Sequence, residues 1–531
     1  MKKPFRKGPL SRLDARKPSL IFLFLAVFVG GAIRLGPVLQ ASFPLNDGGF
    51  FYTMTQELVA EKFSIPKFST YNKLQIPYAY PPLGFFLAGG LQKVTGWDLL
   101  DIYRILPAAL SIFAIPAFYF LAKEITDDDW ALGLSVLMFS FLSPTMEWLV
   151  MGGGMTRSPG FVFSLLAIRS GYLMYTRDKK TDILFTTLFS ALTVLFHPEA
   201  AVHTAAGIGA FLMIKGRSKK GIIKSSLVVI FVLVLTSPWW LQIVRFHGVS
   251  PFLSAGKTGM HNLLNYLWLL SFNITQETGL TSMGVFALIG IFLCFATRKI
   301  LLPMWLIITY LASPRSAPLY LTPVVALLAG EVLSYILRKL DRLQQDKSHK
   351  EKEEKVSFSL LSKLFLTILI LQWSLSSIIN VSKVSVQYTL DSSDLSAMVW
   401  IRENIPENSK FLVLTGITPF KDATSEWFPA IANRVSVATI QGREWIQESD
   451  FNKKYEESIE IQECVIDPLA CFEWNIETEI DYNYIYLRKT IPLQNFSTIS
   501  TTGLEFLLRS LNQYELVFEN KSVLLFQKFT P

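Results

Sequence analysis

Residues 19–52 read SLIFLFLAVFVGGAIRLGPVLQASFPLNDGGFFY and join a long apolar run to an acidic turn. Residues 19–40 are long and apolar enough to span a bilayer, because about 20 helical residues cross its hydrocarbon core. Residues 1–18 are basic, as before a signal peptide, but Arg34 and Gly36 follow instead of a small-residue cleavage site. The stretch therefore predicts a retained first membrane helix, with residues 1–18 as a cytoplasmic tail.

The rest of the chain is also rich in apolar runs. The sequence is 51% hydrophobic and only 17% charged, and its mean hydropathy is +0.36, which is unusual for a soluble domain. We therefore expect a mainly α, polytopic helical membrane domain over residues 19–380, with about eleven spans. The further predicted spans are residues 102–122, 130–146, 159–175, 183–196, 200–214, 222–244, 281–296, 300–312, 318–337 and 358–379.

Basic residues alternate between the two sets of connections that these spans define. One set is rich in Lys and Arg and comprises residues 2–17, 177–180, 215–220, 298–299 and 338–355. The short loops of the other set contain only Arg157, Arg245, Lys257 and Arg315. Since basic loops stay in the cytoplasm, the N-terminus is predicted inside and the C-terminal domain outside. This placement explains the net charge of +8 without a nucleic-acid partner.

A long outer loop, residues 41–101, follows the first span. It contains the acidic turn around Asp47 and a helical stretch that ends at Glu61. Its apolar run, residues 83–91, is too short to cross a bilayer and is predicted to lie along the membrane surface.

Residues 388–531 have a different pattern, which predicts a small soluble α/β domain. The predicted elements are a helix at 395–404, strands at 410–415 and 482–487, and a hairpin of 514–519 with 523–528. Cys464 and Cys471 lie in this domain, and an extracytoplasmic location makes a disulfide between them plausible. Cys294 lies in an apolar run and is expected to be a core residue, and the cysteine spacing does not predict a zinc site.

Asp47 is the first candidate catalytic residue, because it follows the first span between Asn46 and two glycines. Glycines allow a ligand to approach the backbone closely. A carboxylate at this position can deprotonate an acceptor hydroxyl or bind a cation. The alternative is an ordinary Asx turn, since Asn-Asp-Gly is a good turn sequence.

This layout resembles the GT-C superfamily of integral-membrane glycosyltransferases, which includes protein O-mannosyltransferases and aminoarabinose transferases of lipid A. Asp47 matches the acidic residue of the family's first outer loop, and Tyr80-Pro81-Pro82-Leu83 resembles its aromatic- or His-Pro-Pro-Leu element. Arg104 resembles a family arginine, and residues 313–318 resemble a loop facing the lipid phosphate. The resemblance implies a polyprenyl-phosphate-linked sugar as donor and Asp47 as catalytic base or metal ligand.

Two departures from the family limit what carries over. Many relatives have Asp-Glu where this chain has Asp47-Gly48, so a second carboxylate is missing. The Trp-Trp-Asp-Tyr-Gly signature of oligosaccharyltransferases is absent as well. No cofactor follows from the sequence except a divalent cation, for which Asp47 and Glu199 are the candidate ligands.

Arg104, Arg157 and Arg315 are the candidate donor-phosphate residues, because arginine binds phosphate oxygens in a bidentate manner. The alternative is that they are interfacial anchors whose charged ends reach the headgroups. His197 and Glu199 lie at an outer junction of two short spans, where ionisable groups tend to be functional. A capped helix start would also explain them.

The soluble domain interleaves aromatic and charged residues in two short stretches, 426–434 and 441–445. Such surfaces suit a carbohydrate or acceptor, but a packed Trp with a structural ion pair is the simpler explanation. The predicted substrate-binding residues are Tyr52, Tyr80, His197, Glu199, Glu426 and Arg443.

Together these features predict a glycosyltransferase that moves a sugar, with inversion, from a polyprenyl phosphate to an extracytoplasmic glycan, lipid or protein acceptor. The predicted partners are this donor, the acceptor and membrane lipid, in a prokaryotic plasma membrane. The alternative is a transporter or flippase of lipid-linked saccharides, although paired halves and charged broken helices are not evident. A scaffold or sensor would leave the Asp47 loop unexplained.

Overall fold

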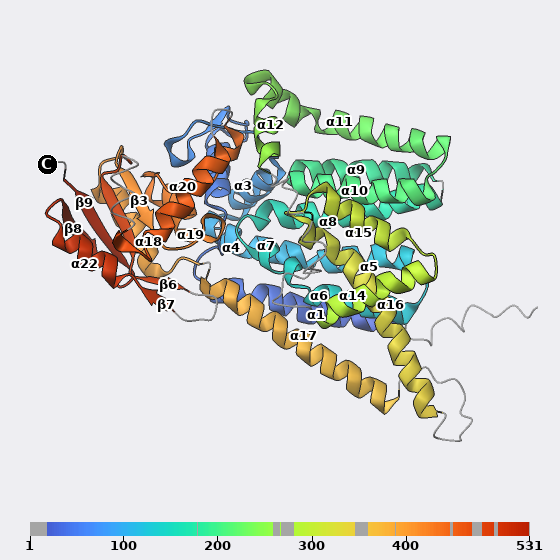
Figure 1. The fold of residues 1–531 in the computed structure, drawn as a ribbon. Helices are drawn as coiled ribbons and strands as arrows, with labels where there is room; N and C mark the ends of the chain where they lie inside the picture. Colours follow the sequence, from blue (N-terminus) through green and yellow to red (C-terminus); the bar gives the residue numbers. More distant parts are fainter. Residues whose placement is uncertain are drawn as a thin grey trace, which may run out of the picture.

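The computed structural model describes residues 18–177, 179–258, 266, 281–345, 359–387, 389–446, 450–469, 480–492 and 498–529. Long helices run side by side through most of the molecule, and a smaller domain with a sheet lies at one end (Figure 1). The predicted tail, residues 1–18, falls outside the described residues except for its last position.

Each predicted span overlaps a helix of this bundle. The bundle helices are α1 (Pro18–Gln40), α4 (Leu99–Ile112), α5 (Ala114–Ile125), α6 (Asp129–Phe141), α8 (Gly154–Thr176), α9 (Lys180–Phe196), α10 (Pro198–Lys215), α11 (Lys219–His247), α14 (Ser282–Ala296), α15 (Leu301–Ala312), α16 (Ala317–Gln345) and α17 (Leu360–Gln387). Helices α4 and α5 together provide one predicted span, Leu99–Ile125. The polytopic helical class is therefore confirmed.

Fewer helices than predicted are long and apolar enough to cross a membrane on their own. Five helices of the described chain meet both criteria, or six if a bent pair counts as one span. The five are α1, α4 with α5, α11, α16 and α17. The remaining predicted spans lie on α8, α9, α10, α14 and α15, which are shorter or carry polar groups. Arg157 and Arg169 lie on α8, and Glu199 and His203 lie on α10.

One predicted span, residues 130–146, is broken rather than continuous. Helix α6 ends at Phe141, and the following helical segment, Ser143–Val150, turns by 69°. Proline favours such a break, and Pro144 lies three positions after the end of α6. Arg34 of α1 stabilises the bend, because its Nη1 donates to the carbonyl of Ser140 at 3.1 Å and its Nη2 to Thr145 Oγ1 at 2.8 Å.

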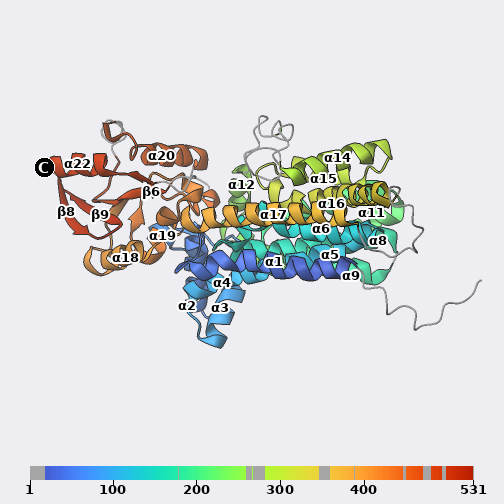
Figure 2. The same ribbon diagram turned by 90° about the horizontal axis from the view of Figure 1, so that it is seen from below.

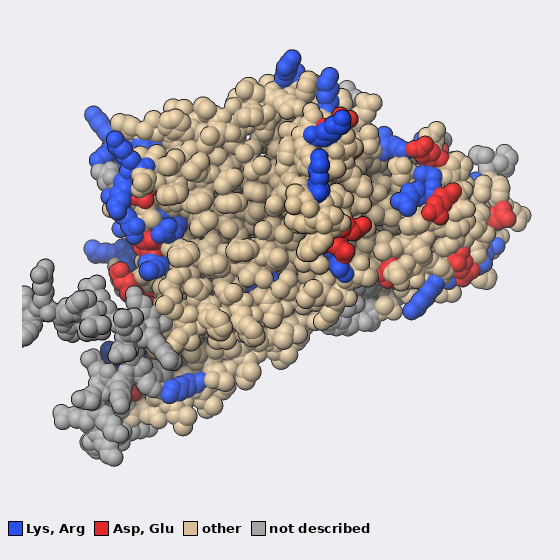
Figure 3. All heavy atoms as spheres, turned by 180° about the vertical axis from the view of Figure 1, so that it is seen from behind, with Lys and Arg blue, Asp and Glu red and all other residues tan. Residues whose placement is uncertain are grey.

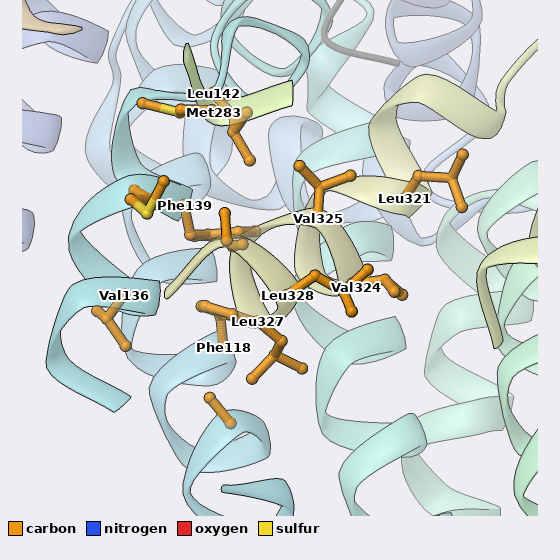
Figure 4. Packing of buried hydrophobic residues seen from close by; sticks show 14 of the residues in the cluster. Phe118, Val136, Phe139, Leu142, Met283, Leu321, Val324, Val325, Leu327 and Leu328 are labelled. Atoms are coloured by element: carbon orange, nitrogen blue, oxygen red, sulfur yellow. The ribbon is translucent and has the colours of Figure 1, made fainter. Parts of the chain in front are cut away.

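The bundle core is formed where α5, α6, α14 and α16 meet (Figure 4). Phe118 stacks on Phe139 with ring centroids 4.3 Å apart. Gly290 lets α14 approach α16 closely, since a Cβ there would lie 2.8 Å from the carbonyl oxygen of Leu328. Small residues at crossings are the usual way in which membrane helices pack.

The outer loop forms a compact unit beside the end of the bundle that faces the smaller domain. It contains α2 (Gly49–Ala60), β1 (Phe68–Ser69), η2 (Tyr71–Lys73), β2 (Ile76–Pro77) and α3 (Leu83–Thr95). Figure 2 shows α2 and α3 projecting across the direction of the long helices. The short helix predicted at residues 83–91 is present and extends to Thr95, where Gly96 ends it in a left-handed conformation.

The C-terminal domain has a five-stranded sheet in the order β4-β3-β5-β9-β8. Its strands are β3 (Lys410–Leu414), β4 (Val435–Ser436), β5 (Tyr484–Arg488), β8 (Tyr514–Glu519) and β9 (Val523–Lys528), and β6 (Thr490–Pro492) pairs with β7 (Thr498–Ser500). Its helices are α18 (Ser392–Asn404), α19 (Ala423–Ala432), α20 (Phe451–Glu463) and α22 (Thr502–Ser510). The predicted helix, strands and hairpin are thus confirmed. Cys464 is buried, but Cys471 lies outside the described residues, so the disulfide stays a prediction.

Charge is distributed unevenly over the molecule. Figure 3 shows an uncharged central band, with Lys and Arg gathered at the end remote from the C-terminal domain. Loops rich in basic residues join α8 to α9 and α10 to α11 at that end. An uncharged band between charged ends is the surface that a multi-pass membrane protein presents to lipid.

Candidate active site

The Asp47 carboxylate binds groups from a loop far along the chain. Asp47 lies in the turn between α1 and α2, where Gly48 has a φ of +125°. Its Oδ1 accepts the backbone N–H of Gly153 at 3.0 Å, and its Oδ2 forms an ion pair with Nη2 of Arg157. These contacts go beyond an ordinary Asx turn, because they join Asp47 to the start of α8.

Arg157 is held by two further contacts. Its Nη1 donates to the carbonyl of Trp148 at 3.0 Å. Its guanidinium carbon lies 5.3 Å from the centroid of the Trp148 ring, within the range of a cation–π interaction. The side chains of Asp47 and Arg157 are only 14% and 17% exposed, so their charges are poorly screened by solvent.

A second polar group lies next to this pair. The Tyr80 hydroxyl lies 2.7 Å from His197 Nδ1 and 3.2 Å from Thr156 Oγ1. His197 Nε2 is 3.6 Å from a carboxylate oxygen of Glu199. Tyr80 and His197 are buried, while the Glu199 side chain is 41% exposed. The predicted residues Tyr80, His197 and Glu199 are thus brought together beside α8.

The third part of the site comes from the C-terminal domain. The backbone N–H of Gly48 donates to Glu426 Oε1 at 2.7 Å. Trp427 Nε1 donates to the carbonyl of Asn46 at 2.8 Å, and the Tyr71 hydroxyl donates to the carbonyl of Glu426 at 2.5 Å. Helix α19 therefore covers the acidic turn, with Glu426 and Trp427 both buried.

Arg315 lies at the edge of the same region. It precedes α16, and its Nη1 donates to the carbonyl of Thr258 at 3.3 Å. Its guanidinium lies 5.0 Å from the ring centroid of Phe420 in the C-terminal domain. Arg315 is exposed, so its cationic group is open to a ligand.

Three predicted residues occupy other positions. Arg104 pairs with Asp101 at 2.7 Å and donates to the carbonyl of Ala41 at 2.8 Å, so its guanidinium stabilises the end of α1. Arg443 Nε donates to the carbonyl of Thr439 at 3.4 Å, within its own domain. The Tyr52 ring lies 5.6 Å from that of Trp427, and its hydroxyl accepts from Gln56 Nε2 at 3.0 Å.

Burial and neighbouring charge raise the pKa of several carboxyl groups that line the junction. Burial, together with the negative charge of Asp47, raises the pKa of Glu426 to about 8. Burial also raises the pKa of Glu444, and the positive charge of Arg315 partly opposes that shift. Burial raises the pKa of any carboxyl group, because removal from water disfavours the ionised form. These shifts favour the protonated, neutral form of Glu426.

The divalent cation expected at Asp47 and Glu199 stays a prediction. Over the residues that the structure covers, no group of three or more His, Cys, Asp or Glu side chains is arranged to hold a metal ion. The Asp47 carboxylate oxygens bind Gly153 and Arg157, and a Glu199 carboxylate oxygen lies 3.6 Å from His197 Nε2. Each carboxylate oxygen has two lone pairs, so these contacts leave room for a cation on Asp47.

The sequence drew attention to most of these side chains but not to their partners. The backbone N–H of Gly153 was not predicted, although the glycine run before Arg157 is its signal. Tyr71 and Trp148 were not predicted, because single aromatic residues in loops carry no pattern that distinguishes them.

The sequence matches no family model and no curated protein. Solved structures do match the fold. The apo form of the oligosaccharyltransferase from Archaeoglobus fulgidus is 14% identical with a TM-score of 0.58, over 90% of this chain and 70% of that one. The same enzyme, AglB, in complex with an inhibitory peptide and a dolichol-phosphate is 13% identical with a TM-score of 0.55, over 88% and 69%.

A second kind of structure matches over nearly its whole length. ArnT from Cupriavidus metallidurans bound to undecaprenyl phosphate is 11% identical, with a TM-score of 0.50, over 96% of this chain and 97% of that one. Identities this low establish the fold alone. The chain therefore has the GT-C fold, as its outer-loop motifs predicted.

Proposed function

We propose that this protein is a membrane glycosyltransferase that transfers a sugar from a polyprenyl-phosphate donor to an acceptor hydroxyl. The observation that carries the proposal is the Asp47–Arg157 ion pair, which joins the start of α8 to a turn that contacts Glu426 of the C-terminal domain. A carboxylate beside an arginine provides a base and an anion-binding group together. The solved structures with the same fold include one bound to undecaprenyl phosphate and one bound to a dolichol-phosphate.

In the proposed reaction the acceptor oxygen attacks the anomeric carbon of the sugar. A new C–O bond forms on one face while the bond to the phosphate oxygen breaks on the other, so the configuration inverts. The hydroxyl proton moves to the carboxylate of Asp47, and the bonding electron pair leaves with the polyprenyl phosphate. Asp47 is assigned the role of general base because proton transfer needs a carboxylate within reach of the acceptor hydroxyl, on the face of the sugar opposite to the leaving phosphate.

Arg157 has two anionic partners in this scheme. Before the donor binds, the guanidinium pairs with Asp47. When the donor phosphate binds Arg157, it competes with Asp47 for the same N–H groups, and the carboxylate is released to meet the acceptor hydroxyl. Arg315, which is exposed at the edge of the region, supplies a second cation for the phosphate.

Tyr80, His197 and Glu199 are proposed to bind the sugar. Carbohydrates are recognised by hydrogen bonds and by aromatic rings, and these three residues combine both features. The centroids of the Tyr80 and Phe51 rings lie 4.5 Å apart, so Phe51 fixes the Tyr80 ring. The Tyr80 hydroxyl is hydrogen-bonded to His197 Nδ1. The proposed site faces the outer side of a prokaryotic plasma membrane, in line with the basic loops at the opposite end.

The test compares wild type with Asp47→Asn and with Asp101→Asn at equal abundance in membranes. Asp101 is the matched control, because it is also an aspartate paired with an arginine, Arg104, on the same part of the chain. The membranes that carry each protein are incubated with a panel of radiolabelled polyprenyl-phosphate sugars, and cell-envelope extract serves as the acceptor. Transfer and released polyprenyl phosphate are both measured.

We expect wild type and Asp101→Asn to transfer sugar from one donor, and Asp47→Asn to lose about 10²–10⁴-fold in rate. Equal transfer by wild type and Asp47→Asn would exclude Asp47 as the base. If no donor gives transfer, but labelled donor crosses the bilayer of vesicles that contain the protein, the protein is a transporter instead.

A further inference from the structure

The C-terminal domain holds the turn that carries Asp47. Asn46 Nδ2 donates to the carbonyl of Phe420 at 3.2 Å, and Trp427 Nε1 donates to the carbonyl of Asn46. The Phe43 ring meets the Trp427 ring edge-on at 4.7 Å. The turn between α1 and α2 thus depends on residues that lie more than 370 positions away in the sequence.

Glu426 makes the contact closest to Asp47. Its Oε1 accepts the N–H of Gly48, the residue directly after Asp47, at 2.7 Å. The backbones of α19 and the turn also approach closely, because a Cβ on Gly49 would lie 2.6 Å from the carbonyl oxygen of Glu426. On the opposite side, a Cβ on Gly48 would lie 3.0 Å from the backbone of Gly152. The peptide after Asp47 is therefore packed between α19 and the loop before α8.

We propose that Glu426 is a positioning residue for the transfer reaction: its carboxyl group fixes the Asp47–Gly48 peptide so that the Asp47 carboxylate meets Arg157 and Gly153. This inference rests on the proposed function, in which Asp47 is the base. It moves Glu426 from substrate binding, its predicted role, to support of the catalytic turn. The C-terminal domain is then part of the active site, and catalysis requires its docking.

The charged and titratable groups around Glu426 determine whether its protonated or its ionised carboxyl group binds the Gly48 N–H. They are Asp47 on the turn, Arg157 on α8, Glu444 on η5 (Arg443–Trp445) and Tyr71 on η2. Burial and the charge of Asp47 favour the protonated carboxyl, whose carbonyl oxygen accepts the Gly48 N–H without adding a second negative charge. Glutamine has the same shape and the same acceptor, so it imitates the protonated form.

The experiment compares Glu426→Gln and Glu426→Ala with wild type and with Glu407→Gln. Glu407 is the matched control, because it also joins the C-terminal domain to the outer loop, through Lys73 at 2.9 Å, but it is exposed. The kcat and KM for the donor are measured from pH 6 to pH 9.5. Hydrogen–deuterium exchange of the peptide that contains Gly48 is measured on the same preparations.

We expect Glu426→Ala to lower kcat by about 10²-fold with little change in KM, as for a misplaced catalytic group. Glu426→Gln should keep the wild-type kcat at pH 7 and keep it above pH 8, where wild type declines as Glu426 ionises. Exchange at Gly48 should be faster in Glu426→Ala and unchanged in Glu426→Gln and Glu407→Gln.

A wild-type kcat in Glu426→Ala, or slow exchange at Gly48 in that variant, would overturn the inference. A decline of Glu426→Gln above pH 8 that follows wild type would overturn the role of protonation. If even the wild type shows no transfer, the proposed function fails, and the exchange of Gly48 still decides whether Glu426 holds the turn.

Discussion

The Asp47 carboxylate and the Arg157 guanidinium form an ion pair between the turn after α1 and the first turn of α8, 110 positions apart in the sequence. The pair is largely shielded from solvent. The backbone N–H of Gly153 donates to Asp47, and Arg157 donates to the carbonyl of Trp148. In such surroundings each charge depends on the other, because an unpaired buried charge is costly. Changes to either residue should therefore affect both the local structure and the proposed chemistry.

Replacing Arg157 should impair the reaction more than it impairs folding. Arg157→Gln removes the cation for the leaving phosphate, and we expect kcat/KM to fall about 10²–10³-fold, as when an oxyanion-stabilising donor is lost. Arg157→Lys should recover only part of this, since a lysine cannot contact Asp47 and the Trp148 carbonyl with a rigid fork. Steady-state transfer kinetics measure both effects.

The matched control for Arg157 is Arg169 on the same helix, which pairs with Glu124 at 2.6 Å near the opposite end of α8. Arg169→Gln should leave kcat/KM within about twofold of wild type, because partly exposed pairs contribute little. Equal losses in Arg157→Gln and Arg169→Gln would mean that the bundle, and not the phosphate site, was disturbed.

Gly48 should tolerate no side chain. Its φ of +125° is strained for any other residue, and a Cβ would lie 3.0 Å from Gly152 and 3.1 Å from the Trp427 ring. We expect Gly48→Ala to lower the free energy of unfolding by roughly 1–3 kcal/mol and to reduce transfer. Thermal unfolding in detergent measures the first effect.

Gly90 provides the comparison, since it lies in α3 of the same loop and a Cβ there meets nothing within 4 Å. Gly90→Ala should be stabilising by about 0.5–1 kcal/mol, because alanine favours the helix. A Gly48→Ala protein as stable as wild type would show that the turn is not packed as described.

Local sequence patterns were sufficient to predict most of the helices and strands of the fold. Residues 19–40 and the hairpin of 514–519 with 523–528 are specified by composition and periodicity over a few residues, and both are found. The bend after α6 was missed, because the apolar run continues through Ser143 and Pro144 and only the geometry reveals the 69° turn. The spans on α8 and α10 were predicted from their apolar residues, and these helices also carry polar groups of the site.

The candidate site was predictable as a set of residues but not as an arrangement. Asp47 and Arg157 were each predicted, the first from its glycines and the second from a loop poor in basic residues. Their pairing and the contact of Glu426 with Gly48 join positions 110 and 378 apart, and no local pattern predicts such contacts. For Arg104, the resemblance to the GT-C superfamily suggested a role at the donor phosphate. In the structure its guanidinium is paired with Asp101.

Tyr80 should contribute through its hydroxyl. Tyr80→Phe removes the hydrogen bonds to His197 Nδ1 and Thr156 Oγ1 and should cost about 1 kcal/mol of stability. Because the same hydroxyl is proposed to orient His197 toward the sugar, the KM for the donor should also rise about tenfold, equivalent to about 1.4 kcal/mol.

Tyr78 is the matched control for Tyr80, since its buried hydroxyl donates to the carbonyl of Met54 at 2.7 Å in the same loop. Tyr78→Phe should lose similar stability but keep the wild-type KM. If Tyr80→Phe and Tyr78→Phe have the same KM, the Tyr80 hydroxyl has only a structural role.

The predicted orientation can be tested by chemical labelling. In a background with Cys294, Cys464 and Cys471 replaced by serine, Ser510→Cys on α22 and Lys219→Cys at the start of α11 provide one exposed thiol each. A membrane-impermeant maleimide should label Ser510→Cys in spheroplasts and Lys219→Cys only after permeabilisation, since basic loops face the cytoplasm. The opposite result would place the proposed active site inside the cell.

Glu426 should make the stability of the protein depend on pH. Its pKa of about 8 in the folded protein exceeds the ordinary value of 4.5, so the folded protein keeps a proton that the unfolded chain releases between those values. Its contribution to the free energy of unfolding is therefore full below about pH 4.5 and is lost as pH rises to about 8.

Glu426→Gln cannot ionise, so its free energy of unfolding should gain on that of wild type as pH rises from 5 to 8, and it should be the more stable protein at pH 8. Glu407→Gln should keep the wild-type slope in this range, because the Lys73 ion pair lowers the pKa of the exposed Glu407 and so moves it away from this range. Parallel curves of Tm against pH for wild type and Glu426→Gln would mean that Glu426 is already ionised in the folded protein. The Gly48 N–H would then be bound by a carboxylate, and the turn would hold two negative charges beside Arg157.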